Sequence, residues 1–193
     1  MPTENELKFV LNLNLSELLK NPESELKDPI TILQGYLYSA PGTSLRIRNS
    51  STLRGPDIGT LTYKQHIRAY SGSPARTVEI ETLIDALDWH DLFCLVAQET
   101  LVKTRYHYYA IQDGKTYKWE IDFFWEKFHN NGDPYFILAE LEMPEGQLLP
   151  DFVPEFIQNY LVYAVPREET QDFSSRKLSN IEYAKQKYAE LTL

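Results

Sequence analysis

Charged residues two positions apart recur along this chain, in segments otherwise made of aliphatic, aromatic and β-branched residues. Successive side chains of a β-strand point to opposite faces, so both members of a doublet share one face and the apolar residues share the other. The pattern therefore indicates a sheet with one charged and one apolar face. The charged positions are Glu4, Glu6 and Lys8; Arg46 and Arg48; Lys64; Glu79 and Glu81; Lys103 and Arg105; Glu120 and Asp122; and Glu140 and Glu142.

The distribution of signs separates two interpretations of this charged face. A single Glu-x-Glu, or Lys103 with Arg105 alone, is usually a solvated strand face. A solvated face would mix signs, because like charges in adjacent positions are destabilising. Here most of the doublets are purely acidic or purely basic. We therefore expect a closed antiparallel barrel whose doublets point inward, with acids that bind cations and bases that bind an anion.

Turn and periodicity signals predict the remaining elements. Asp113-Gly114 is a strong hairpin signal between strands 101–111 and 115–125. We expect further strands at 4–15, 30–38, 45–48, 61–69, 77–84, 135–143 and 161–165. Helices are expected at 17–20 after Ser16, after Asp88, at 152–160, and up to residue 191 after the capping box 179–182. Without βα alternation, this indicates one α+β domain over residues 1–193, dominated by the barrel.

Composition excludes several classes of protein. The net charge of −9 argues against non-specific nucleic-acid binding. No signal peptide and no apolar run of transmembrane length occur, so we expect a soluble, cytoplasmic protein without membrane contact. Cys94 is the single cysteine, which excludes an intrachain disulfide, and its apolar neighbours predict a buried thiol. The histidines share no ligand spacing, and none is assigned to a metal; they are His66, His90, His107 and His129.

Eight stretches, taken in order, resemble the motifs of the CYTH superfamily, the triphosphate tunnel metalloenzymes. The first is Glu4-x-Glu6-x-Lys8, and a stretch near the C-terminus, Phe173-Ser-Ser-Arg-Lys-Leu-Ser, is similar to a further family motif. The resemblance implies an eight-stranded antiparallel tunnel, in agreement with the barrel expected from alternation. The other stretches are Gln34-Gly-Tyr-Leu, Leu45-Arg-Ile-Arg, Thr62-Tyr-Lys, Val78-Glu-Ile-Glu, Val102-Lys-Thr-Arg-Tyr, Trp119-Glu-Ile-Asp-Phe and Leu138-Ala-Glu-Leu-Glu.

The same resemblance implies a function and a role for each residue. Members hydrolyse a phosphoanhydride of an inorganic or organic triphosphate with a divalent metal, so we expect Mg²⁺ or Mn²⁺ and a small-molecule triphosphate, in a monomer or homodimer. The implied metal ligands are Glu4, Glu6, Asp122, Glu140 and Glu142. The implied substrate-binding residues are Lys8, Arg46, Arg48, Lys64, Lys103 and Arg105. The implied catalytic residues are Glu6, Lys8, Tyr36 and Lys64, supported by Glu79, Glu81 and Glu120.

Eight acidic side chains would face six basic ones in such a barrel, so its interior would stay negative until cations bind. We therefore expect metal and anion to bind cooperatively. Two other functions stay open from the sequence. A class IV-type adenylyl cyclase would use the same metals and bases but needs a pocket for adenine. A non-catalytic polyphosphate-binding protein would need fewer carboxylates.

Overall fold

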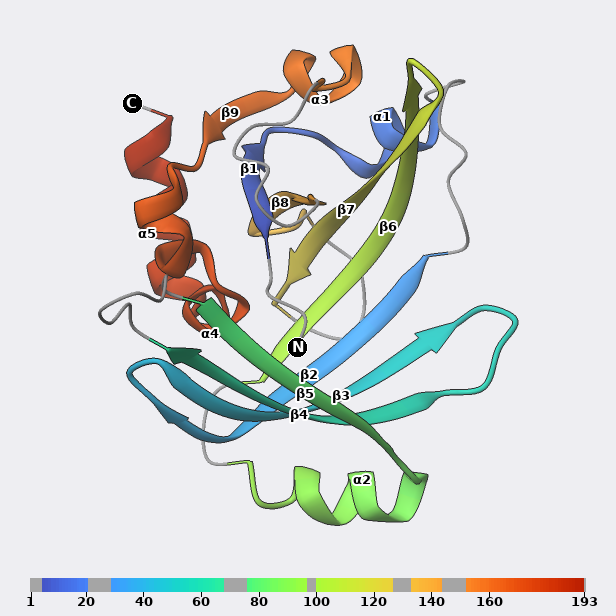
Figure 1. The fold of residues 1–193 in the computed structure, drawn as a ribbon, viewed down its shortest axis with the longest axis vertical. Helices are drawn as coiled ribbons and strands as arrows, with labels where there is room; N and C mark the ends of the chain where they lie inside the picture. Colours follow the sequence, from blue (N-terminus) through green and yellow to red (C-terminus); the bar gives the residue numbers. More distant parts are fainter. Residues whose placement is uncertain are drawn as a thin grey trace.

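The computed structural model describes residues 5–20, 29–67, 76–96, 100–126, 133–143 and 152–192. Within them, nine strands form one antiparallel sheet in the order β5-β4-β3-β2-β6-β7-β8-β1-β9 (Figure 1). The strands are β1 (Glu6–Leu11), β2 (Ile30–Ala40), β3 (Thr43–Thr52), β4 (Ile58–Ile67), β5 (Arg76–Ile84), β6 (Leu101–Gln112), β7 (Lys115–Trp125), β8 (Phe136–Glu142) and β9 (Leu161–Ala164).

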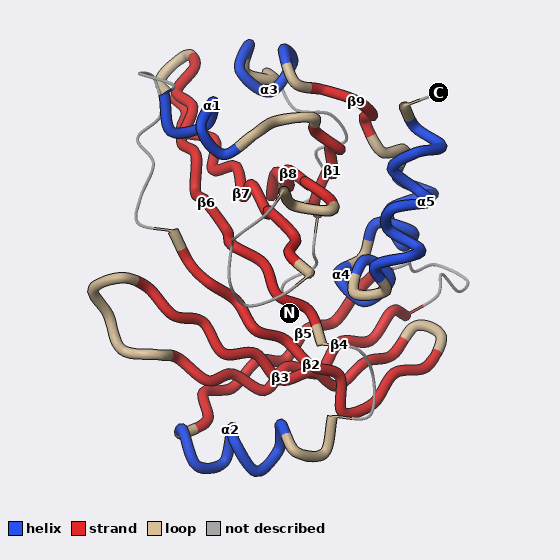
Figure 2. Tube along the Cα trace, turned by 180° about the vertical axis from the view of Figure 1, so that it is seen from behind, coloured by secondary structure: helices blue, strands red, loops and turns tan. Residues whose placement is uncertain are grey.

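The sheet bends into two wings that face each other across a central space. Figures 1 and 2 show β2–β5 as one wing and β1, β7, β8 and β9 as the other, with the long strand β6 passing between them. Two C-terminal helices, α4 (Ser175–Leu178) and α5 (Ile181–Leu191), lie at one end of this space. A 3₁₀ helix, Arg167–Phe173, leads into them. The charged faces of both wings are thereby brought toward one another.

The expected closed eight-stranded barrel is not what the described residues form. Strand β9 pairs with the outer edge of β1, so that Phe9 lies opposite Ala164 and Val10 opposite Tyr163. This edge of β1 is the one that a closing strand would need. The described part of the chain consequently has nine strands in an open sheet, with β5 and β9 at its two edges.

The predicted hairpin between β6 and β7 is confirmed, and its turn explains why. Asp113 and Gly114 both have positive φ, 50° and 75°. A two-residue turn of this kind matches the right-handed twist of the flanking strands. The register then sets Arg105 opposite Asp122 and His107 opposite Glu120. This hairpin therefore fixes which acids lie beside which bases.

The apolar faces of the strands form the core. One cluster packs Phe9 against Trp119, with 5.3 Å between the ring centroids, and Tyr106 against Phe123. A second cluster holds α5 and the 3₁₀ helix on β8, where Phe136 contacts Phe173. The first cluster lies on the side of the strands opposite the doublets. The second continues the charged side beyond the doublets, with Val10 in phase with Lys8 and Leu138 in phase with Glu140.

Helix positions differ slightly from those predicted, because other side chains cap the helices. Helix α1 (Leu15–Lys20) is capped by Asn14, whose Oδ1 accepts from the backbone N–H of Glu17 at 2.9 Å. Helix α2 (Ala86–Phe93) begins after Asp85, whose carboxylate accepts two backbone N–H groups. Asn180 caps α5 in the same way, and α3 spans Glu155–Asn159. Each cap satisfies amides that the first helical turn leaves free.

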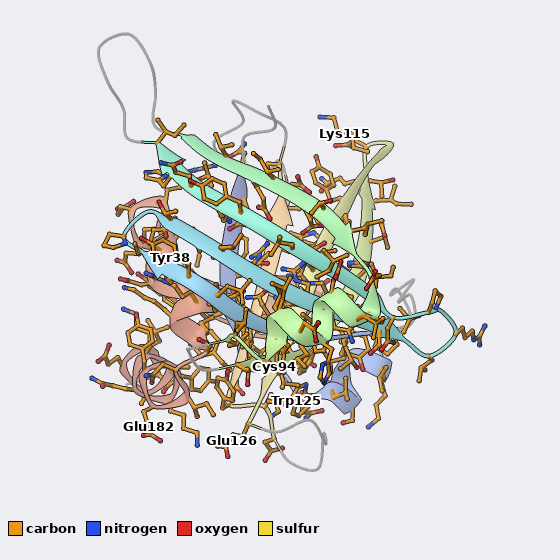
Figure 3. The ribbon with its side chains drawn as sticks, turned by 90° about the horizontal axis from the view of Figure 1, so that it is seen from below. Tyr38, Cys94, Lys115, Trp125, Glu126 and Glu182 are labelled. Atoms are coloured by element: carbon orange, nitrogen blue, oxygen red, sulfur yellow. The ribbon has the colours of Figure 1, made fainter. Side chains whose placement is uncertain are left out.

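The prediction of a buried Cys94 is wrong, since the thiol is exposed. Helix α2 crosses the outer face of the β2–β5 wing and ends at Phe93, so Cys94 lies just past its end (Figure 3). Its apolar neighbour Leu95 is also exposed. None of the described helices is long and apolar enough to cross a membrane.

Candidate functional site

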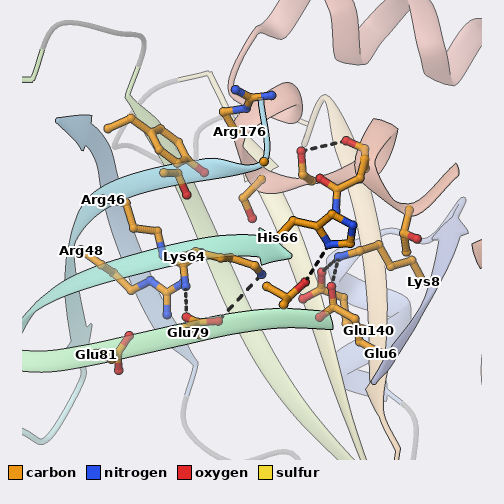
Figure 4. Close-up of a pocket in the computed structure, with 18 of the residues that line it drawn as sticks. Glu6, Lys8, Arg46, Arg48, Lys64, His66, Glu79, Glu81, Glu140 and Arg176 are labelled. Carbon is orange, nitrogen blue, oxygen red and sulfur yellow. Dashed lines mark hydrogen bonds and ion pairs between the residues drawn. The ribbon is translucent and has the colours of Figure 1, made fainter. Parts of the chain in front are cut away.

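A cavity of about 380 Å³ lies between the two wings (Figure 4). Because the doublets alternate with apolar residues, the strands send them to this side. The cavity is lined by both partners of most doublets, by Tyr36 and Lys64, and by residues of the C-terminal segment. The charged lining residues are Glu6, Lys8, Arg46, Arg48, Lys64, Glu79, Glu81, Lys103, Arg105, Glu120, Glu140, Glu142 and Arg176.

Strands β1 and β8 form an acidic wall. Their register sets Glu6 opposite Glu142 and Lys8 opposite Glu140. The Lys8 ammonium lies 2.8 Å from Glu6 and also pairs with Glu140. Burial alone would lower the pKa of Lys8, but Glu140 and Glu6 outweigh it and raise that pKa. Burial alone would raise the pKa of Glu140, but Lys8 and Arg105 lower it, so this carboxyl stays ionised.

Strands β2–β5 form the opposite, mainly basic wall. Arg46 donates to Glu79 at 2.7 Å, and Lys64 lies 3.8 Å from the same carboxylate. Arg48 instead donates through Nε and Nη2 to the amide oxygen of Gln34, at 3.3 and 3.2 Å. Burial and the neighbouring charges of Arg46 and Arg105 lower the pKa of Arg48 to about 10. Among the described residues, no carboxylate lies within ion-pairing distance of Arg48.

Strands β6 and β7 connect the walls through a buried charge cluster. Both oxygens of Asp122 accept from Arg105, each at 2.7 Å, and one also accepts from Lys103. Arg105 reaches Glu140 as well, at 3.1 Å, and pairs with Glu120. Burial and Arg105 lower the pKa of Lys103 to about 8, against the attraction of Asp122. These contacts fix the positions of Lys103 and Arg105 in the cavity lining.

Asp122 is fully buried and is not among the residues that line the cavity. Its two oxygens are already engaged by Lys103 and Arg105. The geometry therefore favours a role in holding these bases, and its assignment as a metal ligand stays a prediction. Glu4 lies outside the described residues, so its predicted metal role stays a prediction too.

The predicted supporting acids contact bases or hydroxyls. Glu79 pairs with Arg46 and Lys64, and the hydroxyl of Thr62 donates to Glu81 at 2.8 Å. On β7, Glu120 pairs with Arg105 and Lys118 and lies 3.4 Å from the ring of His107. Although burial would raise the pKa of Glu120, these neighbours lower it.

Arg176 was not predicted as a site residue. It lies on α4, lines the cavity, and donates to the Ser39 hydroxyl at 2.6 Å. The sequence feature that could have identified it is its position in Phe173-Ser-Ser-Arg-Lys-Leu-Ser, the stretch that is similar to a family motif. With it, the described lining carries seven bases and six carboxylates. The interior expected to be negative is thus nearly balanced in charge over the residues that the structure describes.

The acidic wall offers donors of the type that Mg²⁺ and Mn²⁺ prefer, since Glu6, Glu140 and Glu142 supply only oxygen. Glu6 and Glu142 lie directly opposite each other on two paired strands, and a bound cation would relieve the repulsion between their carboxylates. However, no three acids, histidines or cysteines in the described ranges are close enough together to form a ready-made site. Lys8 lies between Glu6 and Glu140 instead. The residues thus fit a cation in chemical type, provided that Lys8 shares these carboxylates.

Comparison with known proteins finds similar solved structures at low identity. No family model and no curated protein matches this sequence. The chain is similar to the PH1819 protein from Pyrococcus horikoshii OT3, at 21% identity over 98% of this chain and 91% of that one, with a TM-score of 0.46. It is also similar to the inorganic triphosphatase NE1496, at 22% identity over 93% of this chain and 95% of that one, with a TM-score of 0.48. The solved structures that this chain resembles include that of an inorganic triphosphatase.

Proposed function

We propose that this chain hydrolyses a phosphoanhydride bond of a triphosphate in its cavity, with the help of a divalent cation. The observation that carries the proposal is the division of one cavity into a basic wall and an acidic wall. The β2–β5 wing presents Arg46, Arg48 and Lys64, whereas β1 and β8 present Glu6 and Glu142. Figure 4 shows Arg46, Arg48 and Lys64 on one side of the cavity and Glu6 with Glu140 on the other.

Two arginines of the basic wall have guanidinium groups that are suited to bind an anion. The Nε of Arg46 is buried without a hydrogen-bond partner among the described residues. Arg48 is held by a neutral amide rather than a carboxylate. A buried donor without a partner is costly, as is a buried charge without a counter-ion. A phosphate would accept from the Nε of Arg46 and neutralise the charge of Arg48. Arginine also binds phosphate through two parallel hydrogen bonds, which gives directional as well as electrostatic recognition.

The acidic wall would hold the cation through Glu6, Glu140 and Glu142. When bound, Mg²⁺ or Mn²⁺ would neutralise phosphate charge and lower the pKa of a water molecule. Phosphoryl transfer needs positioning and charge stabilisation more than covalent participation by the protein. In this proposal Arg46, Arg48 and Lys64 align the phosphate chain. Lys8 holds Glu6 and Glu140 in place through its ion pairs.

The lining favours recognition of the phosphate chain over recognition of a base. Apart from the ring of His66, Tyr36 is the one aromatic side chain among the described lining residues, and it is 3% exposed. An adenine ring would require an apolar or aromatic surface to stack on. We therefore propose tripolyphosphate, or a nucleoside triphosphate bound with little discrimination among bases. A cyclase would need such a base pocket, which these residues do not supply.

The products formed from ATP test the proposal against both alternatives. The protein is incubated with ATP and Mn²⁺, and the products are separated by chromatography. We expect orthophosphate and ADP, and the Arg46→Gln variant should release much less. Lys185→Gln serves as the matched control, because Lys185 pairs with Glu126 on the exposed surface. Cyclic AMP with pyrophosphate would refute hydrolysis in favour of a cyclase. Binding of both ATP and tripolyphosphate without any product from either would refute an enzyme.

A further inference from the structure

A chain of three hydrogen-bonded side chains runs across the neighbouring strands β2 and β3 of the basic wall; they are Arg48, Gln34 and Tyr36. Gln34 and Tyr36 lie two residues apart on β2, so they share a face, and β3 sets Arg48 opposite Gln34 and Arg46 opposite Tyr36. Gln34 is fully buried, with an exposed fraction of 0%. Its amide nitrogen lies 2.8 Å from the Tyr36 hydroxyl oxygen, while its oxygen faces Arg48.

The direction of these hydrogen bonds is fixed by the chemistry of the partners. A guanidinium can only donate, so the Gln34 atom that faces Arg48 must be the oxygen. The other end of the amide is then the NH₂ group, which donates to the Tyr36 oxygen. Since this oxygen acts as the acceptor, the hydroxyl hydrogen must point elsewhere. No acceptor for it occurs among the residues that the structure describes.

The surroundings of Tyr36 also favour an anion as the missing acceptor. Arg46, Arg48 and Arg176 are close enough for their charges to lower the pKa of Tyr36, although burial has the larger effect and raises it. The hydroxyl therefore keeps its proton. All three neighbours are arginines, which offer no acceptor. An oxygen of a bound anion, or a water in its absence, is what can accept from the hydroxyl.

We propose that Gln34 is a positioning residue that makes Tyr36 an obligate hydrogen-bond donor to the anion gripped by Arg46 and Arg48. This rests on the proposed function, because it assumes that a phosphate chain occupies the cavity. Gln34 touches no substrate in this proposal. It acts by donating to the Tyr36 oxygen, which turns the hydroxyl hydrogen away from Gln34 and presents it to the ligand.

A double-mutant cycle tests whether Gln34 acts through Tyr36. Gln34→Met removes the amide with little change in volume, and Tyr36→Phe removes the hydroxyl. The dissociation constant of tripolyphosphate with Mg²⁺ is measured by calorimetry for the protein, both single variants and the double variant. We expect Tyr36→Phe to weaken binding roughly ten- to a hundredfold, the range of one hydrogen bond to a charged group. Gln34→Met should cost clearly less when Tyr36→Phe is already present than when the tyrosine is intact.

An isosteric variant keeps the test decisive if Gln34→Met does not fold. Gln34→Glu still accepts from Arg48, but it also accepts from Tyr36, so it turns the hydroxyl hydrogen away from the ligand. We expect Gln34→Glu to weaken binding more than Tyr36→Phe does, and to lose part of its effect when combined with Tyr36→Phe. Gln171→Glu adds the same charge elsewhere on the cavity lining, and its effect should be equal with and without Tyr36→Phe.

The outcomes separate this inference from the proposed function. Binding with the expected coupling supports the positioning role of Gln34. Tripolyphosphate binding with strictly additive effects of Gln34 and Tyr36 variants would overturn the inference and leave the proposed function standing. No binding to the unmodified protein would overturn both. The split between KM and kcat adds a further readout, because a lost hydrogen bond to the bound phosphate raises KM, whereas a merely structural role lowers the active fraction without changing KM.

Discussion

Replacing Asp122 by Asn should destabilise the fold through the two bases that this carboxylate holds. Asp122 accepts from Arg105 with both oxygens and from Lys103 with one, and it is fully buried. Asn keeps the volume but removes the charge, which leaves the two cations buried beside each other. Removing one partner of a buried ion pair costs about 3–5 kcal/mol. For a chain of this size, that corresponds to a melting temperature lower by roughly 6–20 °C.

The pH dependence of this loss follows from the pKa of Lys103, which is lowered to about 8 from 10.5. Between those values the unfolded chain binds more protons than the folded one, so stability rises with pH. In Asp122→Asn the attraction that opposes the lowering is gone, so the pKa of Lys103 falls further and the ammonium discharges at lower pH. The difference in stability between the two proteins should therefore be large at about pH 6 and smaller at about pH 9.

Urea unfolding followed by tryptophan fluorescence measures both effects. Glu126→Gln is the matched control, because it breaks an exposed pair with Lys185 and should cost below about 1 kcal/mol. A loss in Asp122→Asn below about 1 kcal/mol near neutral pH would refute the reasoning. So would a loss that does not change with pH, since Lys103 would then not be the group left unpaired.

Three further variants address the metal, the anion and the packing. Glu142→Gln should abolish turnover while the melting temperature without ligand stays within a few degrees, because Glu142 is exposed to the cavity; a Gln variant with normal turnover would contradict its role. Tripolyphosphate with Mg²⁺ at a hundredfold excess over its dissociation constant should stabilise the protein by about 2.7 kcal/mol, and Arg48→Ala should reduce the thermal shift; equal stabilisation by orthophosphate would count against a site for a phosphate chain. Gly35→Ala should destabilise by about 1–3 kcal/mol, since its Cβ would lie 2.6 Å from Val96, and Val96→Ala should restore stability. Additive losses of stability from Gly35→Ala and Val96→Ala would show that the clash between the two side chains is not the cause.

Local sequence patterns were sufficient for the strands and for the side that each doublet faces. Alternation is a property of a single strand, so Glu140 and Glu142 could be placed on the charged face without knowledge of any partner. The closed eight-stranded barrel was not confirmed over the described residues, for the opposite reason. Which strand occupies an open edge depends on distant segments, and β9 takes the edge of β1 that closure would have required.

The site itself could be predicted only in part. Spacing identifies a charged face, but it does not tell whether a carboxylate opens into a cavity or lies beneath its neighbours, as Asp122 does. Arg176 reaches the cavity because α4 lies against the sheet, an arrangement that no local pattern encodes. Cys94 sits in an apolar sequence, yet α2 ends just before it and leaves the thiol exposed.

Release of orthophosphate from tripolyphosphate, measured with Mg²⁺ present and again after chelation, tests the central claim most directly. The two-walled cavity predicts steady release that stops in excess chelator and resumes when Mg²⁺ is restored. The melting temperature without substrate should change little, because the ion pairs of Lys8 hold Glu6 and Glu140 in the absence of metal. Undiminished release in excess chelator, or no release under any of these conditions, would contradict a metal-dependent triphosphatase.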